Sequence, residues 1–300
     1  MKPVFRQFLM AGMAAAGLLL GTAQSADKLP VTASFSILGD LVRVVGGERV
    51  SVTTLVSPDE DAHVFEPKPA DAKALLQSRL LVVNGLGFEP WALKLSRSAG
   101  YKGATLVVST GVKPRLMADE KGRDETDPHA WQNPNNVVMY VRNISAALAK
   151  VDQAGATAYQ ANAEAYVKEL QTLDAWTKEQ FAAVPLAKRK VITSHDAFGY
   201  FAAQYQIKFL APQGVSTDAE PSAKEVAQLI KQIQREKIKA VFVENMSSPK
   251  LLAQLSQDAG ATVGASLYAD ALSSADKPGA SYLKMMRHNV TQLAAGMKLN

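Results

Sequence analysis

The sequence predicts an α/β protein of two α/β lobes with parallel-type sheets, joined by a long helical connector. Three observations lead to this prediction. Short β-rich runs alternate with helically spaced segments in the first part of the chain, no strand pattern follows Pro134 for about fifty residues, and the alternation resumes at Lys190. Alternating strands and helices favour a parallel sheet with helices on both faces.

Residues 1–26 have the pattern of a secretory signal peptide. Lys2 and Arg6 supply positive charge, an apolar run extends from Phe8 to Leu20, and small residues around Ala23 offer a cleavage point. The apolar run is too short to span a bilayer comfortably, although a single membrane anchor is the alternative. We therefore expect an exported chain that does not span the membrane after cleavage.

Composition narrows the function further. The chain contains no cysteine, which excludes a disulfide framework and a lipid anchor on a cysteine, so the periplasm is the expected location. The formal net charge of +5 is mild, and basic residues mix with acidic ones without interleaved aromatic residues. This pattern does not support nucleic-acid binding.

The first lobe is expected over residues 27–133. Its predicted strands are Val31–Phe35, Val50–Val56, Leu80–Val83 and Thr105–Val108. Its predicted helices are Ile37–Val45, Pro69–Gln77 and a short one around Trp91. The unbroken apolar run at residues 80–83 is typical of a strand buried on both faces, and residues 105–108 are expected to form another.

The helical connector is expected over residues 134–188 and the second lobe over residues 189–300. Asn133-Pro134 is a helix-start signal, and a break is predicted at residues 152–155 between two helices. The second lobe has predicted strands at Lys190–Thr193, Ile207–Ala211, Ala240–Val243 and Ala261–Leu267. Its predicted helices are Phe198–Tyr205, Pro249–Ala259 and Ser281–Met297. A further helix is expected to be capped by Glu220-Pro221-Ser222 and to end at Arg235.

Four short segments each contain one metal-capable side chain beside a predicted strand or loop. They are Asp61-Ala62-His63, Asp127-Pro128-His129, Thr193-Ser194-His195-Asp196 and Tyr268-Ala269-Asp270. Three imidazoles and one carboxylate complete a tetrahedral zinc shell with no open position. Ligands of open α/β sheets bind beyond the carboxyl ends of strands. Because two segments precede the connector and two follow it, a shared metal site would lie in the cleft between the lobes.

The spacing of these residues is wide, and a lone loop histidine is more often simply exposed, so spacing alone is weak evidence. The local motifs add to it, because the chain resembles the zinc- and manganese-binding periplasmic solute-binding proteins of metal ABC importers. The resemblance covers almost the whole chain after residue 26. Its motifs are Asp61-Ala62-His63-Val64-Phe65-Glu66-Pro67, Asp127-Pro128-His129-Ala130-Trp131-Gln132-Asn133-Pro134, Ser194-His195-Asp196-Ala197-Phe198-Gly199-Tyr200-Phe201, Leu267-Tyr268-Ala269-Asp270-Ala271-Leu272, Val83-Asn84-Gly85-Leu86-Gly87-Phe88-Glu89-Pro90-Trp91 and Glu220-Pro221-Ser222-Ala223.

The resemblance implies that His63, His129, His195 and Asp270 are the metal ligands. It also implies two lobes joined by a rather rigid helix, metal in the cleft, and delivery to an ABC permease of the inner membrane. We expect the protein to be a monomer.

The resemblance favours Zn²⁺ as the bound substrate, with Mn²⁺ or iron as the alternative. Manganese-associated members often have glutamate where this chain has His195, and imidazole suits zinc whereas oxygen ligands suit manganese. Many zinc-type members also have a histidine-rich loop before the second ligand. The equivalent stretch here, Met117–Asp127, has no histidine, and we interpret it as a solvated loop. Whether the acidic loop 119–127 helps to acquire metal stays open.

Other residues near these motifs receive simpler interpretations. His288 is read as a surface or helix-end histidine. Trp131 and Phe198 are expected to shape the dry wall of the site. Asp127 and Asp196 are expected either to hydrogen-bond the ligand imidazoles or to cap helices.

An enzyme is the main rival prediction. A zinc hydrolase usually keeps three protein ligands and an open position for water, which four protein ligands would fill. Ser194-His195-Asp196 cannot form a catalytic triad because three consecutive side chains cannot adopt that geometry. No Gly-x-Ser-x-Gly elbow or phosphate loop occurs. An adhesin-type interaction protein is a third possibility, but the sequence has no repeats. We therefore expect a metal carrier and not an enzyme.

Overall fold

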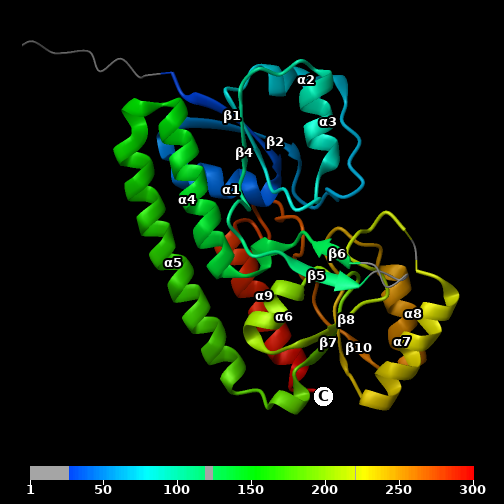
Figure 1. Ribbon diagram of the computed structural model, residues 1–300. Helices are drawn as coiled ribbons and strands as arrows, with labels where there is room; N and C mark the ends of the chain where they lie inside the picture. Colours follow the sequence, from blue (N-terminus) through cyan, green and yellow to red (C-terminus); the bar gives the residue numbers. More distant parts are fainter. Residues whose placement is uncertain (1–26, 119–123, 220) are drawn as a thin grey trace, which may run out of the picture.

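The computed structural model describes residues 27–118, 124–219 and 221–300. The predicted signal segment 1–26 and residues 119–123 of the acidic stretch thus lie outside the described residues. Two four-stranded parallel sheets lie in separate lobes, and one long helix runs beside both (Figure 1). The predicted architecture of two α/β lobes is confirmed.

The first sheet has the strand order β2-β1-β3-β4. Its strands are β1 (Leu29–Phe35), β2 (Val50–Val56), β3 (Leu80–Val83) and β4 (Ala104–Val107), connected through helices α1 (Ser36–Gly46), α2 (Pro69–Leu76) and α3 (Pro90–Ser98). In β3, Leu80 and Val82 belong to the apolar cluster that includes α1, whereas Leu81 and Val83 pack with residues of α2 and α3. Burial on both faces explains why β3 is an unbroken apolar run.

Strand β4 corrects the prediction of a second fully buried strand. Among the described strands it lies at the edge of the sheet and pairs with β3 alone. Ala104 and Thr105 are exposed, and only the second half of the strand is partly buried. An apolar run of four residues does not distinguish a central strand from an edge strand.

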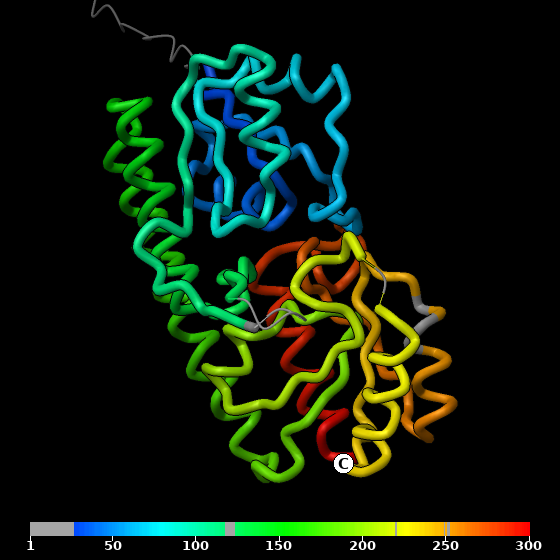
Figure 2. The backbone as a smooth tube through the Cα atoms, turned by 45° about the vertical axis from the view of Figure 1, so that its right-hand side comes forward, coloured from blue at the N-terminus to red at the C-terminus, as the bar shows by residue number. Residues whose placement is uncertain are grey.

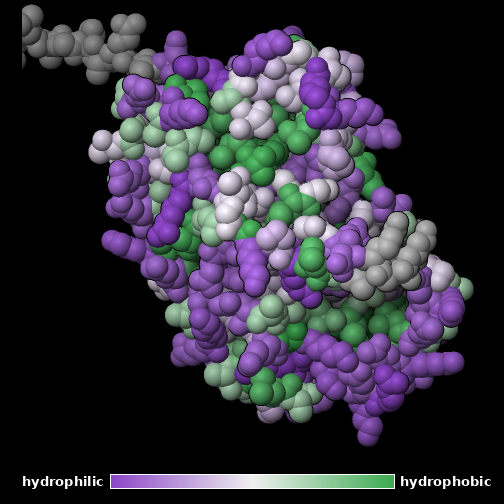
Figure 3. Space-filling model, in the orientation of Figure 1, coloured by the Kyte–Doolittle hydropathy of each residue, from purple (hydrophilic) through white to green (hydrophobic). Residues whose placement is uncertain are grey.

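The helical middle of the chain forms two packed helices, α4 (Pro134–Val151) and α5 (Ala156–Ala182). Asn133 caps α4 by accepting the Asn135 N–H, and Gln153–Gly155 forms a 3₁₀ turn at the predicted break. Helix α5 contacts α1 in the first lobe and α9 (Tyr282–Met297) in the second. Its outer face carries mainly hydrophilic side chains, as Figure 3 shows.

The second sheet has the order β10-β9-β7-β8. Its elements are β7 (Lys190–Ile192), α6 (Gly199–Tyr205), β8 (Lys208–Leu210), α7 (Ala223–Glu236), β9 (Ala240–Val241), α8 (Pro249–Ala259), β10 (Thr262–Val263) and α9. Ser222 forms the predicted cap of α7, in a capping box with Glu225, while Glu220 lies outside the described residues. The predicted strand 261–267 is shorter, because Leu267 pairs separately with Glu244 beyond β9.

A two-stranded antiparallel hairpin, β5 (Arg115–Ala118) and β6 (Asp124–Asp127), was not predicted. The interpretation of residues 117–127 as a solvated loop is wrong for the described residues 117, 118 and 124–127. Backbone hydrogen bonds between the two strands stabilise this hairpin. It has no alternating apolar pattern to indicate it in the sequence, and the large apolar side chain of Leu116 is exposed. The hairpin lies between the lobes (Figure 1), and its end delivers Asp127 to the candidate site.

One apolar cluster extends through both lobes. It includes Val31 of β1, Leu170 of α5 and Leu293 of α9, all buried. The lobes are therefore joined by shared core packing as well as by α5. Within the described ranges, no helix is both long enough and apolar enough to cross a bilayer.

Candidate metal centre

His63, His129, His195 and Asp270 converge between the lobes. Each offers one ligand atom, and these atoms lie within 4.8 Å of one another. Oδ2 of Asp270 lies 3.2 Å from Nε2 of His63 and 3.0 Å from Nε2 of His195, and its Oδ1 lies 3.6 Å from Nε2 of His129. The side chains of His129, His195 and Asp270 are fully buried, and that of His63 is 5% exposed. The structure brings together all four residues singled out in the sequence.

The polar atoms at the centre of this cluster face one another without well-aligned donors. Among the described residues, no donor meets either carboxylate oxygen of Asp270, or Nε2 of His195, with good hydrogen-bond angles, although imidazole nitrogens lie 3.0 to 3.6 Å from the carboxylate. A buried carboxylate without donors is strongly unfavourable unless a cation or a proton compensates it. The cluster is therefore chemically suited to a cation at its centre.

The same local turn positions His63 and His129. Asp61 Oδ1 accepts the His63 N–H at 2.9 Å, and Asp127 Oδ1 accepts the His129 N–H at 3.0 Å. An aspartate that accepts the N–H two residues later closes an Asx turn. This explains physically why the motif Asp-x-His occurs at both positions.

Buried polar contacts fix the second turn further. Nδ1 of His129 hydrogen-bonds Asp127 Oδ1 at 2.9 Å, which leaves Nε2 facing the cluster. Asn84 Nδ2 donates to the Pro128 carbonyl at 3.0 Å, while its Oδ1 accepts the Tyr140 hydroxyl. Asp127 thus hydrogen-bonds a candidate imidazole, which was one of the two roles open for it from the sequence.

Glu244 positions His195 and was missed in the sequence. Its Oε1 accepts the backbone N–H groups of Ser194 and His195 at 2.9 and 3.1 Å, and its Oε2 contacts Nδ1 of His195. Glu244 is 1% exposed and follows β9, beside the segment that follows β7. A glutamate directly after a buried strand was the only available signal. Asp196, for which both this role and helix capping were open from the sequence, donates its backbone N–H to the Gly214 carbonyl.

Asp270 lies on a strap, residues 269–282, that bonds chiefly to the first lobe and to the turn before α4. Trp131 Nε1 and Gln132 Nε2 both donate to the Ala269 carbonyl, at 2.9 and 2.7 Å. The Leu272 N–H donates to Ser36 Oγ, and the Leu272 carbonyl accepts the N–H of Asp59. The strap ends where the N–H of Tyr282 donates to Asp40. Asp270 is therefore held by contacts that flank it on both sides.

Asp127 is itself held by the hairpin and α6. Arg115 Nη1 donates to Asp127 Oδ2 at 3.1 Å. The Tyr200 hydroxyl accepts the Arg115 N–H at 2.9 Å and donates to the Asp127 carbonyl at 3.3 Å. Gly199 packs so closely against this ion pair that a Cβ atom would overlap both side chains.

The charges in the cluster shift its pKa values in complementary directions. Burial alone would lower the pKa of His129, but the charge of Asp270 and the hydrogen bond to Asp127 raise it to about 9. Burial would likewise lower the pKa of His195, yet Glu244 and Asp270 raise it well above its ordinary value. Burial would raise the pKa of Asp270, but His129 and His195 lower it well below its usual range. The site thus favours positive charge on His129 and His195 beside an ionised Asp270.

Aromatic rings form one wall of the site. The Phe88 ring centroid lies 4.7 Å from that of His63, and Trp131 lies 5.2 Å from His129 and 4.7 Å from Phe88. Trp131 therefore occupies the wall position expected for it, and Phe88 was missed. Phe198 instead stacks on Phe209 at 4.9 Å, inside the second lobe.

His288 lies within α9, away from this cluster. Its Nε2 donates to the Ser266 carbonyl at 2.8 Å, and its ring packs on Tyr268. It is partly exposed and mid-helix, so it is a surface histidine and not a helix-end one.

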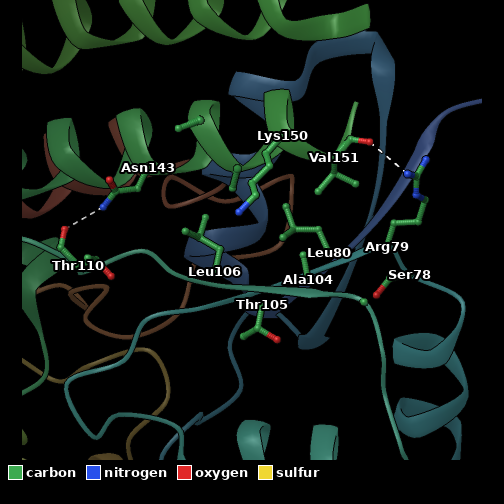
Figure 4. A pocket seen from close by; sticks show the side chains of 13 residues that line it. Ser78, Arg79, Leu80, Ala104, Thr105, Leu106, Thr110, Asn143, Lys150 and Val151 are labelled. Carbon is green, nitrogen blue, oxygen red and sulfur yellow. Dashed lines mark hydrogen bonds between the residues drawn. The ribbon is translucent and has the colours of Figure 1, made fainter. Parts of the chain in front are cut away.

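Two cavities have different relations to the site. One of about 480 Å³ lies directly outside His63 and is lined by parts of residues 86–90, 125–128 and 215–218. Another, of about 770 Å³, lies between β4 and α4, where Lys150 extends toward the strand and Arg79 donates to the Val151 carbonyl (Figure 4). None of the four clustered residues lines this second cavity.

Known proteins resemble this chain over most of its length. The family model for zinc-uptake complex component A, periplasmic, matches residues 31–296. Among curated proteins, the chain is 32% identical to the manganese-binding lipoprotein MntA of Halalkalibacterium halodurans, over 92% of this chain and 91% of the relative. It is 28% identical to the manganese ABC transporter substrate-binding lipoprotein PsaA of Streptococcus pneumoniae, over 96% and 95%.

Solved structures share the fold. The periplasmic zinc-binding protein TroA of Treponema pallidum matches with a TM-score of 0.85 and 25% identity, over 90% of this chain and 99% of that one. The Mn-bound periplasmic metal-binding protein of Candidatus Liberibacter asiaticus matches with a TM-score of 0.81 and 30% identity, over 90% and 100%. Because a family model and relatives match nearly the full length, this chain belongs to the family of zinc-uptake complex component A, the metal-binding substrate-binding proteins of ABC transporters.

Proposed function

We propose that this chain binds one divalent transition-metal ion through His63, His129, His195 and Asp270 and delivers it to an ABC permease. The observation that carries the proposal is the convergence of four metal-capable atoms within 4.8 Å, in a buried site where, among the described residues, no donor is well aligned with the Asp270 carboxylate. Tightly clustered buried donors of this kind are typical of metal ligands.

The surrounding charges support a divalent cation. Asp270, Asp127 and Glu244 place three carboxylates in or beside the cluster, all essentially buried. Arg115 pairs with Asp127. With neutral histidines, Arg115 and one divalent cation offset the charges of these three carboxylates, and the partly buried Asp61 and Asp196 add negative charge nearby, which reduces the electrostatic cost of burying the ion.

Zinc is the ion that we favour. Three imidazole nitrogens and one carboxylate oxygen suit Zn²⁺ in tetrahedral geometry, whereas manganese prefers more oxygen ligands. Manganese is the second candidate, because the curated relatives reported above are named as manganese proteins and one matched structure is Mn-bound.

We also propose that the protein is a carrier and not an enzyme. Four protein donors would leave no open position on a tetrahedral ion for an activated water. Its expected place is the periplasm, after cleavage of the segment 1–26. The two curated relatives are named lipoproteins, whereas this chain contains no cysteine.

Titration of the purified protein with Zn²⁺ against a competing chelator tests the ligand assignment. We expect one ion per chain and no hydrolytic turnover. His195→Ala should remove most of the affinity, whereas His288→Ala, a histidine outside the cluster, should bind like the parent protein. Unchanged affinity in His195→Ala would refute the assignment.

The metal content of protein isolated from its native cells tests the choice of ion. Zinc exceeds manganese in intrinsic affinity at most sites, so titration in vitro does not reveal the physiological metal. Zinc in native protein supports the favoured assignment. Manganese in native protein, together with transport of manganese, would replace it.

A further inference from the structure

We propose that the hydrogen bond between Thr217 and Asp61 is a latch between the lobes that sets how long a metal ion remains in the site. Thr217 Oγ1 donates to Asp61 Oδ2 at 2.7 Å, and the two residues lie 156 positions apart in the sequence. The inference rests on the proposed function, because it concerns the residence time of the ion held by the four clustered residues.

Asp61 connects this bond directly to a candidate ligand. While its Oδ2 accepts the Thr217 hydroxyl, its Oδ1 accepts the N–H of His63 at 2.9 Å. One carboxylate therefore fixes the backbone turn that carries His63 and at the same time binds the opposite lobe. Both residues are partly buried, which protects the bond from competing water.

The segment that carries Thr217 is connected to a second candidate ligand. Gln213 pairs with His195 in an isolated parallel bridge, and the Gly214 carbonyl accepts the Asp196 N–H at 3.0 Å. Residues 213–218 thus extend from the turn that holds His195 to the turn that holds His63. Figure 2 shows this segment reaching the loop that follows β2 in the first lobe.

The latch also lies at the outer side of the site. Of the four clustered residues, His63 alone has any exposed side-chain surface, and it lines the 480 Å³ cavity together with Val215, Ser216 and Asp218. Val215 is buried at 6% exposure beside the latch residue. The segment that Thr217 holds therefore covers the side of the cluster from which an ion can leave.

Breaking the latch would remove the hydrogen bond that holds this segment to the first lobe. Its backbone bonds to other segments in the described chain, at Gln213 and Gly214, lie on the His195 side. The cover over His63 would then loosen, and the turn of His63 would lose the link to the second lobe that passes through Asp61, although Asp59 would still accept a hydrogen bond from Asn245. A hydrogen bond to a charged acceptor is among the stronger ones in proteins, so its loss should accelerate metal release measurably.

Zinc dissociation from the full chain tests this proposal. The protein is loaded with one equivalent of Zn²⁺, mixed rapidly with excess chromogenic chelator, and followed by stopped-flow absorbance. Thr217→Val, which keeps the branched shape but removes the hydroxyl, should release zinc about tenfold faster. Thr217→Ser, which keeps the hydroxyl, should release it at the parent rate. Circular dichroism and thermal unfolding establish that each variant is folded.

A double-mutant cycle with Asp61→Ala separates the latch from the turn at His63. If the latch exists, adding Thr217→Val to Asp61→Ala causes no further acceleration. Three outcomes would overturn the proposal while leaving the metal-binding function intact. They are equal release rates in Thr217→Val and the parent protein, release from Thr217→Ser as fast as from Thr217→Val, and additive effects in the cycle. Failure of the parent protein to bind zinc in a 1:1 ratio would instead refute the proposed function itself.

Discussion

The carboxylate of Glu244 holds His195 at two points, with Oε1 accepting its backbone N–H at 3.1 Å and Oε2 contacting its Nδ1. Both residues are buried, and they follow neighbouring strands of the second sheet. This arrangement directs Nε2 of His195 toward Asp270 and fixes the tautomer that leaves Nε2 free for a metal ion.

Glu244→Ala should weaken zinc binding by roughly 10- to 100-fold, because outer carboxylates orient ligand imidazoles and increase their basicity. Glu244→Gln should weaken it less, since the amide oxygen still accepts from Nδ1. Chelator competition at constant pH measures both affinities. Parent-like binding in the alanine variant would show that Glu244 serves only the fold.

Trp131→Phe should weaken both the fold and the metal site. The substitution removes the donor to the Ala269 carbonyl, next to Asp270, and leaves a small void in a fully buried position. We expect a loss of about 1–3 kcal/mol in the free energy of unfolding, together with a few-fold loss of zinc affinity.

Trp176→Phe is the matched control for that variant. Trp176 lies in α5, where its ring contacts Arg287, remote from the clustered residues. Urea unfolding and zinc titration of both variants distinguish the two effects. Equal zinc affinities in both variants would contradict a role of Trp131 in placing Asp270.

Zinc affinity should decrease as the pH falls below about 9. The pKa of His129 in the metal-free site is raised to about 9, so at lower pH this imidazole holds a proton that zinc must displace. Between these two pKa values His129 binds a proton in the folded protein but not in the unfolded chain, where its ordinary pKa of 6.5 applies. Its stabilising contribution to the metal-free fold is therefore complete below pH 6.5 and is lost as the pH rises through about 9.

Chelator competition at a series of pH values measures this dependence, with correction for the titration of the chelator. Each proton released should change the affinity by up to about tenfold per pH unit. A constant affinity between about pH 6 and about pH 9 would contradict the prediction.

Gly199→Ala should destabilise the protein and weaken the site, because the added methyl group would overlap the Arg115–Asp127 ion pair. Overpacking of this kind typically costs about 1–3 kcal/mol. Gly214→Ala is the control, since a Cβ atom there meets nothing within 4 Å. Thermal unfolding of both variants, with and without zinc, should show a loss for Gly199→Ala only.

The elements and the four clustered residues were largely predictable because their signals are local. The alternation of apolar runs indicated both sheets, and the Asp-x-His motif reflects a turn closed within three residues. Thr105–Val108 was misjudged as fully buried, since the position of a strand in its sheet depends on pairing with distant segments.

The surroundings of the site were less predictable because they depend on long-range contacts. Glu244 meets His195 across 49 positions, and Thr217 meets Asp61 across 156. Neither pair has a sequence pattern. Phe198 lies close to His195 in the sequence but packs on Phe209, because α6 begins there and turns the ring into the lobe.

The strap that carries Asp270 makes the four-residue cluster asymmetric between the lobes. Leu272, two residues after Asp270, donates to Ser36 in the first lobe, whereas Leu267, three residues before it, is hydrogen-bonded to Val243 and Asn245 in the second. His63 and His129 are held by the first lobe and the hairpin, and His195 is held by the second sheet through Glu244. A relative movement of the second sheet would therefore draw His195 away from His63 and His129 and pull on Asp270 from one side. Release of the ion would then begin with the loss of His195, while Asp270 is the donor that spans the two lobes.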